Sequence, residues 1–380
     1  MKPTIFDTTT VLADLGWDDL TQQGDYYSSA EWLGYFRELH AGYQAYGAAL
    51  VDGRIRAGVA LHEVDVDSHP LNRPDACLAS QLAPDGPESG AEAFLPNATA
   101  HLMPTLSLGG RTPGTTAFLH DPDIDNRKYD DLLELLLEQA ERIAANRNLR
   151  SVTLPYVDDP HMRSVLLRRG YVGYSTETYS MIALSGRSNF DDYVDSLRPK
   201  PRRQIRSDRR KIEAAGWTYQ VIPLEEAPLE ELCRLQAMNA DRHGVPGGLE
   251  EAVRKQEMVM RVLPGRSWVA IGRAPSGQIG ACSFFIRWRD ELYSRQTGVD
   301  QTLTNGCPIF YETTYYQIIE YGISTGVTSI HYSVTSAHGK KLRGCIQRKQ
   351  TGFTKCLDGQ DQKWLEAVVR DIPAEKVDGL

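Results

Sequence analysis

The sequence has no long hydrophobic run. Its longest apolar stretch, Leu132 to Leu137, is interrupted by Glu134, whereas a membrane-spanning helix needs about 20 consecutive apolar residues. The first twenty residues carry several acids and no apolar block, which is unlike a secretory signal peptide. We therefore expect a cytoplasmic protein without a membrane span.

Cysteine pairs are also missing. The six cysteines are scattered and form no C-x-x-C pair, which argues against a disulfide framework and predicts free thiols in a reducing compartment. His338, Cys345 and Cys356 are conceivable zinc ligands, but their spacing matches no structural zinc pattern. We expect no metal site.

Positive charge is in deficit overall but concentrated in one place. The 380 residues carry a net charge of -8, and this length suggests two domains. Residues 198–211 read RPKPRRQIRSDRRK, where eight Lys and Arg residues are opposed only by Asp208. Such a run in an acidic protein is either a solvated helix face or a docking site for a polyanion.

A similar order of elements occurs twice along the chain. Hydrophobic periodicity and turn residues predict hairpin, strand, helix and strand in each half. In the first half we expect strands at 43–51, 54–62, 101–119, 151–157 and 171–184, and helices at 130–146 and 159–169. In the second half we expect strands at 267–273, 279–288, 291–299 and 329–334, and a helix at 308–324.

This repetition predicts a mixed α/β fold made of two similar units, each a mixed sheet flanked by helices. We place the first unit at residues 1–187 and the second at 188–380, with the basic segment opening the second unit and a seam near 186–195. Gly216 is a suitable residue to end the basic helix.

Several strings, in this order, carry a resemblance to a known family. They are FDDYVDSLRPKPRRQIRSDRRKIEAAGW (190–217), NADRHGVP (239–246), TGVDQ (297–301), YETTYYQIIEYGI (311–323) and HGKKLRG (338–344). The chain resembles the tandem GNAT-fold transferases of the Fem family and their relatives in natural-product and antibiotic biosynthesis. The resemblance covers most of residues 26–357.

The resemblance implies acyl transfer to an amine, with formation of an amide. The donor is acyl-CoA in ordinary GNAT enzymes and aminoacyl-tRNA in Fem-type enzymes, and neither a metal nor a redox cofactor is implied. The expected partners are thus aminoacyl-tRNA and a small-molecule or peptide amine acceptor, such as a cell-wall precursor or a secondary metabolite, and not DNA.

The turns before two predicted helices help to choose between the donors. CoA-dependent GNAT units bind the pyrophosphate through backbone N–H groups in a Gly-rich turn that contains Arg or Gln. The corresponding turn at 300–306 has one Gly, no Arg and an acid, and the turn at 121–126 has three aspartates. The string Arg111 to Gly114 fits this pattern in part but precedes its strand. Neither unit is therefore predicted to cradle CoA well.

The basic segment is the alternative site for a phosphate-bearing partner. At helical spacing, Arg202, Arg206 and Arg209 share one face, with Arg203 and Arg210 beside it. Arginine contacts to phosphates give affinity for RNA without sequence readout. The alternative is a solvated amphipathic helix with acidic partners. We expect these five arginines to bind tRNA or a phosphorylated acceptor.

The resemblance also suggests residues for the chemistry. The family places a lysine near the donor carbonyl, and Lys340 or Lys341 matches it, with Arg343 in the same turn. Such a group would stabilise the oxyanion of the transition state, where one donor contributes about 3 kcal/mol. Glu312 is a candidate base, although an acid in the first turn of a helix also complements the helix dipole.

Other polar and aromatic residues are candidates for substrate binding. Asp241 and His243 lie in a Gly- and Pro-rich segment that could grip the acceptor. Tyr316 and Tyr332 could stack on a terminal adenine, although tyrosines at such spacing are more often core residues.

The sequence thus leaves three functions open. We expect an aminoacyl-tRNA-dependent aminoacyltransferase. A CoA-dependent N-acyltransferase and a degenerate GNAT pair that acts as a binding module are the alternatives. Direct binding of acetyl-CoA would favour the second, and an exposed Lys340–Arg343 loop without chemistry would favour the third.

Overall fold

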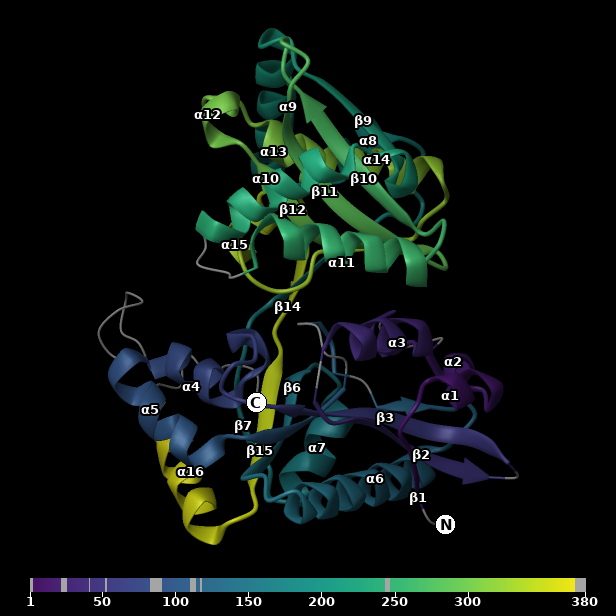
Figure 1. The fold of residues 1–380 in the computed structure, drawn as a ribbon, viewed down its shortest axis with the longest axis vertical. Coiled ribbons are helices and arrows are strands. Elements are labelled where there is room, and N and C mark those ends of the chain that lie inside the picture. Colours follow the sequence, from purple (N-terminus) through teal and green to yellow (C-terminus); the bar gives the residue numbers. More distant parts are fainter. Residues whose placement is uncertain are drawn as a thin grey trace. The chain divides into compact units, whose positions relative to one another are not determined.

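The structure is a computed structural model that describes residues 3–21, 26–40, 42–51, 53–82, 91–109, 114–116, 118–242 and 247–372. The chain forms two compact units (Figure 1). The first unit comprises Met1–Tyr179 and Arg348–Leu380, and the second comprises Ser180–Gln347.

The first unit is built from one sheet with helices on both faces. Its strands are β1 (Pro3–Phe6), β2 (Gln44–Val51), β3 (Arg54–Val64), β4 (Thr105–Leu108), β5 (Leu119–His120), β6 (Ser151–Val157), β7 (Val172–Ser175) and β15 (Thr351–Cys356). Its helices are α1 (Thr10–Asp14), α2 (Trp17–Leu20), η2 (Tyr26–Ser28), α3 (Ala30–Leu39), η3 (Pro70–Asn72), α4 (Pro74–Leu82), α5 (Ala91–Leu102), α6 (Asn126–Asn146), α7 (Pro160–Arg168) and α16 (Gly359–Asp371).

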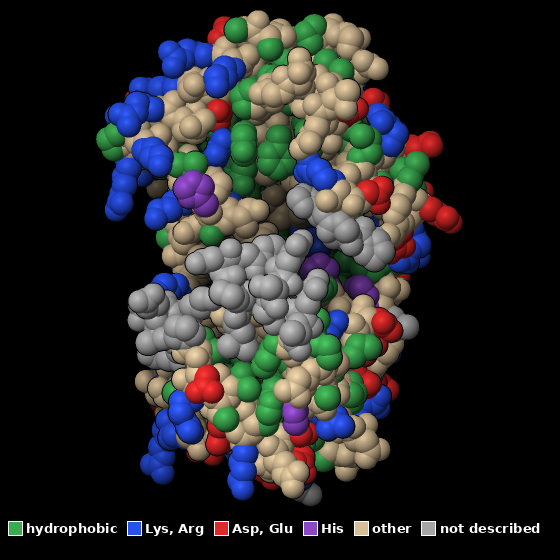
Figure 2. All heavy atoms as spheres, turned by 90° about the vertical axis from the view of Figure 1, so that its left-hand side faces the viewer, with side chains coloured by type: hydrophobic (Ala, Val, Ile, Leu, Met, Phe, Trp, Pro, Cys, Tyr) green, Lys and Arg blue, Asp and Glu red, His purple; other side chains and the backbone are tan. Residues whose placement is uncertain are grey.

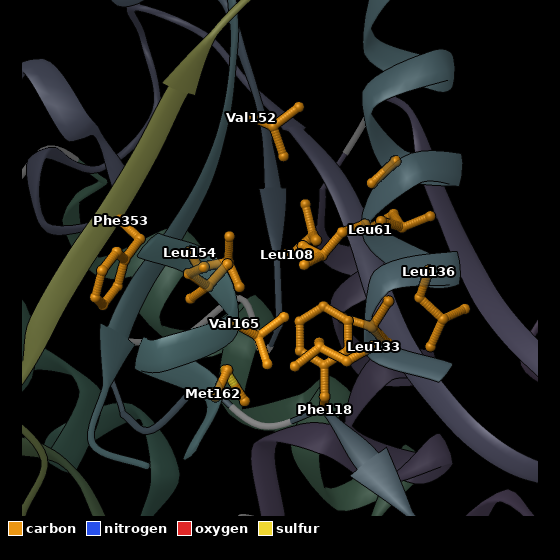
Figure 3. Close-up of a cluster of buried hydrophobic side chains, with 14 of the residues drawn as sticks. Leu61, Leu108, Phe118, Leu133, Leu136, Val152, Leu154, Met162, Val165 and Phe353 are labelled. Atoms are coloured by element: carbon orange, nitrogen blue, oxygen red, sulfur yellow. The ribbon is translucent and has the colours of Figure 1, made fainter. Parts of the chain in front are cut away.

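The strands of the first sheet follow the order β1-β2-β3-β4-β6-β15-β7, with β5 paired to β3. Only the β4–β6 pairing is parallel among the strand pairs described in this sheet. Helices α6 and α7 pack on one face through the main hydrophobic cluster, where Leu133, Leu136, Val152, Leu154 and Phe353 converge (Figure 3). The wide apolar stripe of α6 thus packs against one face of the first sheet.

The second unit repeats the architecture. Its strands are β8 (Tyr179–Ala183), β9 (Thr218–Pro223), β10 (Ser267–Arg273), β11 (Ile279–Trp288), β12 (Glu291–Val299), β13 (Ser329–His331) and β14 (Ile346–Arg348). Its helices are α8 (Phe190–Ser196), α9 (Pro199–Ala214), η4 (Leu224–Glu226), α10 (Leu229–Arg242), α11 (Gly248–Val262), α12 (Gln301–Thr304), α13 (Ile309–Tyr311), the π-helical turn η5 (Glu312–Tyr316), α14 (Gln317–Ser324) and α15 (Ala337–Lys341).

The second sheet has the order β14-β8-β13-β12-β11-β10-β9, with β12 and β13 parallel. Strand β12 contains a bulge opposite β11, between the pairs Ser283↔Thr297 and Phe285↔Ser294, and bulges of this kind re-aim side chains next to functional sites. Gly298 allows α10 to lie directly on this strand, because a Cβ at Gly298 would come within 2.7 Å of the backbone of Leu235.

These two units confirm the mixed α/β, tandem GNAT-like fold predicted from the sequence. Strands 151–157, 267–273, 279–288 and 291–299 have the predicted bounds. Helices α4 and α5 lie largely between the strands predicted at 54–62 and 101–119, where we predicted no element.

The structure divides the chain differently from the predicted boundary of 1–187 and 188–380. Residues 348–380 belong to the first unit, because β15 inserts between β6 and β7 and Phe353 enters the first core. The segment 171–184 is likewise not one strand pair, since β7 joins the first sheet and β8 joins the second. Pairing across long sequence separations decides both points, and local patterns do not record it.

Candidate functional site

The basic segment forms helix α9 of the second unit, which buries a narrow stripe. Ile205, Asp208 and Ile212 face inward at helical spacing. Proline occupies the first helical position, Pro199, where a missing N–H costs nothing. The remaining positions, rich in arginine, point outward or sideways, and Figure 2 shows Lys and Arg side chains gathered along one edge of this unit.

The predicted stripe of Arg202, Arg206 and Arg209 is engaged within the protein. Arg202 donates to the carbonyl oxygens of Asp195 and Leu197, at 2.5 and 2.9 Å, and so caps the carboxyl end of α8. Arg206 forms an ion pair with the side chain of Asp195. These two arginines therefore join α8 to α9.

Arg209 turns towards the interior. Its guanidinium pairs with Glu312 at 2.9 Å and Glu320 at 3.0 Å. The same group lies 3.8 Å from the centre of the Phe190 ring, a distance at which a cation–π contact is favourable. Arg209 thus connects the basic helix to the helical segment that follows β12.

Arg203 and Arg210 differ from these three. Both are exposed, and neither forms a hydrogen bond or ion pair with any residue that the structure describes. Both line a groove of about 540 Å³ between α8 and α9, whose walls also include Phe190, Val194 and Ile205. This groove, which we call the α8–α9 groove, offers apolar walls, the guanidinium groups of Arg203 and Arg210, and one carboxylate, that of Asp191.

Behind α9 lies a buried polar network centred on Asp208. Its carboxylate accepts hydrogen bonds from Tyr316 Oη at 2.6 Å, from Arg343 at 3.1 Å and from Gln204 at 2.8 Å. The Arg343 guanidinium also lies 3.5 Å from the centre of the Tyr311 ring. Tyr316 and Arg343, two of the predicted site residues, therefore form hydrogen bonds with Asp208. The sequence suggested Asp208 only as an acidic partner on the helix surface.

Glu312 is fully buried in the π-helical turn η5. Its Oε1 accepts from Arg209 and from Gln317, at 2.9 and 2.8 Å, while Oε2 has no hydrogen-bond partner among the described residues. Burial raises the pKa of Glu312, and the charge of Arg209 opposes this effect only in part. This carboxylate has no exposed surface in the structure, and its ion pair is with Arg209.

The two neighbouring lysines, Lys340 and Lys341, differ in exposure. Lys340 is buried and Lys341 is exposed. The Lys340 ammonium donates to the carbonyl oxygens of Tyr332 at 2.6 Å, Val334 at 2.5 Å and Ser333 at 3.3 Å. These carbonyls occupy the donors that an oxyanion would need, so the contacts favour a role for Lys340 in holding the loop.

The loop that Lys340 holds is strained. Ser333, Thr335 and Ser336 have positive φ angles of 56°, 67° and 49°, which are uncommon for non-glycine residues and cost free energy. The loop follows the carboxyl end of β13, next to the bulged strand β12. Tyr332, at its start, is buried and packs on Tyr315 with ring centres 4.8 Å apart.

Of the remaining predicted residues, Asp241 does not join this network. Asp241 is exposed in the last turn of α10, and His243 lies outside the described residues. The network instead includes Asp208, Gln317 and Glu320, which the sequence analysis did not propose as site residues. Asp208 had a detectable signal, since it is the one acid of the basic run and lies between Ile205 and Ile212 on the buried stripe.

The turns that precede α12 and α6 show how each unit uses its backbone N–H groups. Asp300 Oδ1 accepts from the N–H groups of Thr302 and Leu303, each at 3.0 Å. In the first unit, Asp125 accepts from the N–H of Lys128 at 2.8 Å and Asp121 accepts from Asp123 at 3.0 Å. Aspartate carboxylates thus accept hydrogen bonds from four backbone N–H groups at these turns, a kind of donor that also binds pyrophosphate.

A family comparison gives this geometry its context. A sequence model of the FemAB-like family, described as peptidoglycan biosynthesis/recognition, matches residues 112–375. The chain belongs to the FemAB-like family. This membership supports a transferase, as the resemblance implied, and the matched segment covers all of the second unit.

Solved structures agree on the fold of this FemAB-like protein. FemX is similar over 97% of this chain and 99% of its own, with a TM-score of 0.62 and 12% identity. L-PGS from Bacillus licheniformis gives 94%, 96%, 0.52 and 12% for the same quantities. A tandem GNAT protein from the clavulanic acid biosynthesis pathway gives 93%, 98%, 0.54 and 10%. The sequence matches no curated protein significantly.

The described residues contain neither a membrane-spanning helix nor a cluster of metal ligands. None of the helices found there is long and apolar enough to span a bilayer. In the same part of the chain, no group of three or more His, Cys, Asp or Glu side chains is arranged to hold a metal ion.

Proposed function

We propose that this FemAB-like protein transfers an aminoacyl group from aminoacyl-tRNA to an amine on a small molecule or cell-wall precursor. The observation that carries the proposal is the contrast between two kinds of phosphate site. The turns where GNAT units bind CoA are capped by their own aspartates. The α8–α9 groove, in contrast, presents Arg203 and Arg210 without protein partners among the described residues.

In this reaction the amine nitrogen attacks the ester carbonyl of the donor. The C–N bond forms, the C–O bond to the terminal ribose breaks, and the ribose hydroxyl leaves with a proton. No cofactor is needed, because the ester is already activated. The reaction would take place in the cytoplasm, where charged tRNA is available.

The contacts suggest a division of labour among the predicted site residues. Arg203 and Arg210 would bind donor phosphates. Arg202, Arg206 and Arg209 would hold α9 in place, with Glu312 behind Arg209. Lys340 would position the loop 333–336, while Arg343 would fix the turn after α15 to α9 through Asp208. Lys341, exposed in the same turn, stays available for a substrate anion.

A coupled assay tests the donor. Purified protein is incubated with total tRNA, amino acids, synthetases and a panel of amine acceptors, and products are read by mass spectrometry. We expect product formation that RNase abolishes, and no heat of binding when acetyl-CoA is titrated calorimetrically.

Turnover with acetyl-CoA in RNase-treated protein would replace the proposal by the CoA-dependent alternative. Absence of transfer from either donor over the whole acceptor panel, with RNA binding retained, would favour a binding module.

A further inference from the structure

The first unit contains a second hollow, of about 180 Å³, that the functions above do not use. It lies at the carboxyl end of β6, between the short strand β5 and the first turn of α6. Ligands of open α/β sheets bind outside the carboxyl ends of strands. Its inner wall is formed by Phe118 and Met162, which belong to the core cluster drawn in Figure 3. A cavity of about 150 Å³ can hold benzene, so this hollow has room for a side-chain-sized group.

The polar part of the wall consists of hydrogen-bond acceptors and hydroxyl groups. It is formed by Thr115, Thr116, His120, Tyr129, Asp158 and Asp159. No lysine or arginine is among the described residues that line it. An occupant that donates hydrogen bonds and carries positive charge therefore complements this wall.

His120 has a defined tautomer. Its Nδ1 lies 3.1 Å from the carbonyl oxygen of Asp121, and because a carbonyl can only accept, Nδ1 carries the proton. In the neutral imidazole the other ring nitrogen, Nε2, is then an acceptor, and it makes no hydrogen bond with the described residues. The His120 ring packs against the ring of Tyr129, with centres 4.3 Å apart.

The two carboxylates are only partly satisfied. Two arginines act on the charge of Asp158. Arg348 lies at 3.9 Å and its side chain is 54% exposed, so this pair contributes little, and Arg163 acts in the same direction. Burial raises the pKa of Asp158, with Arg348 opposing the shift. Asp159 caps α7 by accepting from the N–H of His161 at 2.8 Å. Each carboxylate thus retains acceptor capacity towards the hollow.

We propose that this hollow binds the ammonium group of a primary amine. The three N–H donors of an ammonium match the carboxylates of Asp158 and Asp159 and the Nε2 of His120, and the Tyr129 ring adds a cation–π contact. This assignment rests on the proposed function for its role, which is recognition of the acceptor or of the aminoacyl group. A protonated amine has no lone pair, so it is recognised here and does not react while it is bound.

The test uses the full chain and a probe that needs no transfer reaction. Imidazole resonances of isotopically labelled protein are followed by NMR while n-butylammonium chloride is added, with n-butanol as the neutral control of equal length. We expect a saturable shift of the His120 resonances with the ammonium only. Equal shifts with butanol, or no shift with either compound, would overturn the proposal.

Charge-neutralising variants sharpen the result. Asp158→Asn and Asp159→Asn should each weaken butylammonium binding by about tenfold or more, and asparagine at 159 retains the helix cap. Asp123→Asn, in the acidic turn before α6 and outside the hollow, should bind as the unsubstituted chain does. Circular dichroism verifies folding, and unchanged affinity in both folded hollow variants would refute the site.

Two further arms identify the source of the amine. A 3′-aminoacylamino-adenosine and its N-acetyl derivative are titrated in the same way. A His120 shift with the free amine alone assigns the hollow to the donor, and no shift with either, while butylammonium binds, assigns it to the acceptor. Because these titrations involve no transfer, failure of butylammonium binding overturns only the hollow. Absence of RNA-dependent product overturns only the proposed function.

Discussion

The guanidinium of Arg343 lies 3.1 Å from the carboxylate of Asp208, and both side chains are almost fully buried. One residue comes from the basic helix α9 and the other from the turn after α15, 135 positions later. This contact ties the turn after α15 to the helix that presents Arg203 and Arg210.

Arg343→Met should destabilise the second unit by about 3–5 kcal/mol, because it leaves the buried Asp208 charge without its cation. Adding Asp208→Asn should recover part of this loss, since no unpaired charge then remains. Urea unfolding measures both variants, with Lys341→Met as an exposed control. A loss no larger than that of the control would show that the pair does not stabilise the unit.

Lys340→Met should increase amide exchange in the loop 333–336 in the absence of any substrate, because it removes the donors that hold three loop carbonyls. Mass spectrometry of deuterium uptake checks this, and kcat should fall in parallel. Lys341→Met should leave the uptake unchanged. If Lys340→Met lowers kcat while the uptake stays the same, the ammonium acts directly on the reacting groups.

Arg203→Glu combined with Arg210→Glu should weaken binding of aminoacyl-tRNA and flatten its salt dependence. Each lost phosphate contact reduces the slope of log K against log[salt] by about one. Fluorescence anisotropy at several salt concentrations gives the slope. Lys363→Glu, on the exposed side of α16 in the first unit, is the matched control. An unchanged slope in the double variant would remove the α8–α9 groove from donor binding.

The stability of the second unit should fall in acid partly through Glu291. Burial opposes ionisation of this carboxylate, but contacts from His331 at 3.2 Å, Tyr293 at 2.6 Å and Ser329 at 3.0 Å outweigh it and lower the pKa of Glu291 to about 2. Because the unfolded value is about 4.3, the contribution is present above pH ~4.3 and is lost as the pH falls towards 2.

Glu291→Gln should therefore lower the Tm at pH 6, and the difference from the unsubstituted chain should shrink between pH ~4.3 and 2. Calorimetry over this range checks it. Glu250→Gln, at an exposed acid in the first turn of α11, is the control. A Tm difference that is constant with pH would mean that the Glu291 charge does not contribute.

Local patterns were sufficient for most elements of the fold. The apolar stripe of α6, the fully buried strand β6 and the turn between β10 and β11 are each encoded by neighbouring residues, and these predictions were confirmed. The same reasoning identified α9 and its charge. It could not assign β15, because a six-residue strand carries no record of which sheet it joins.

The candidate site shows the same limit at the level of side chains. Helical spacing placed Arg202, Arg206 and Arg209 on one face, which suggested a joint role in phosphate binding. In the structure these three arginines form hydrogen bonds or ion pairs with Asp195, Leu197, Glu312 and Glu320, because these residues lie against that face. The arginines beside the face, Arg203 and Arg210, are the ones that remain exposed without partners among the described residues.

The sequence by itself determined the repeated α/β order, the basic helix and the acidic turns, since each depends on residues close together in the chain. Only the tertiary structure decided which arginines form ion pairs and hydrogen bonds within the protein and which lysine is buried. It also decided that Asp158, Asp159 and His120 line one hollow. These are properties of packing, where segments far apart in sequence compete for the same buried charges and hydrogen bonds.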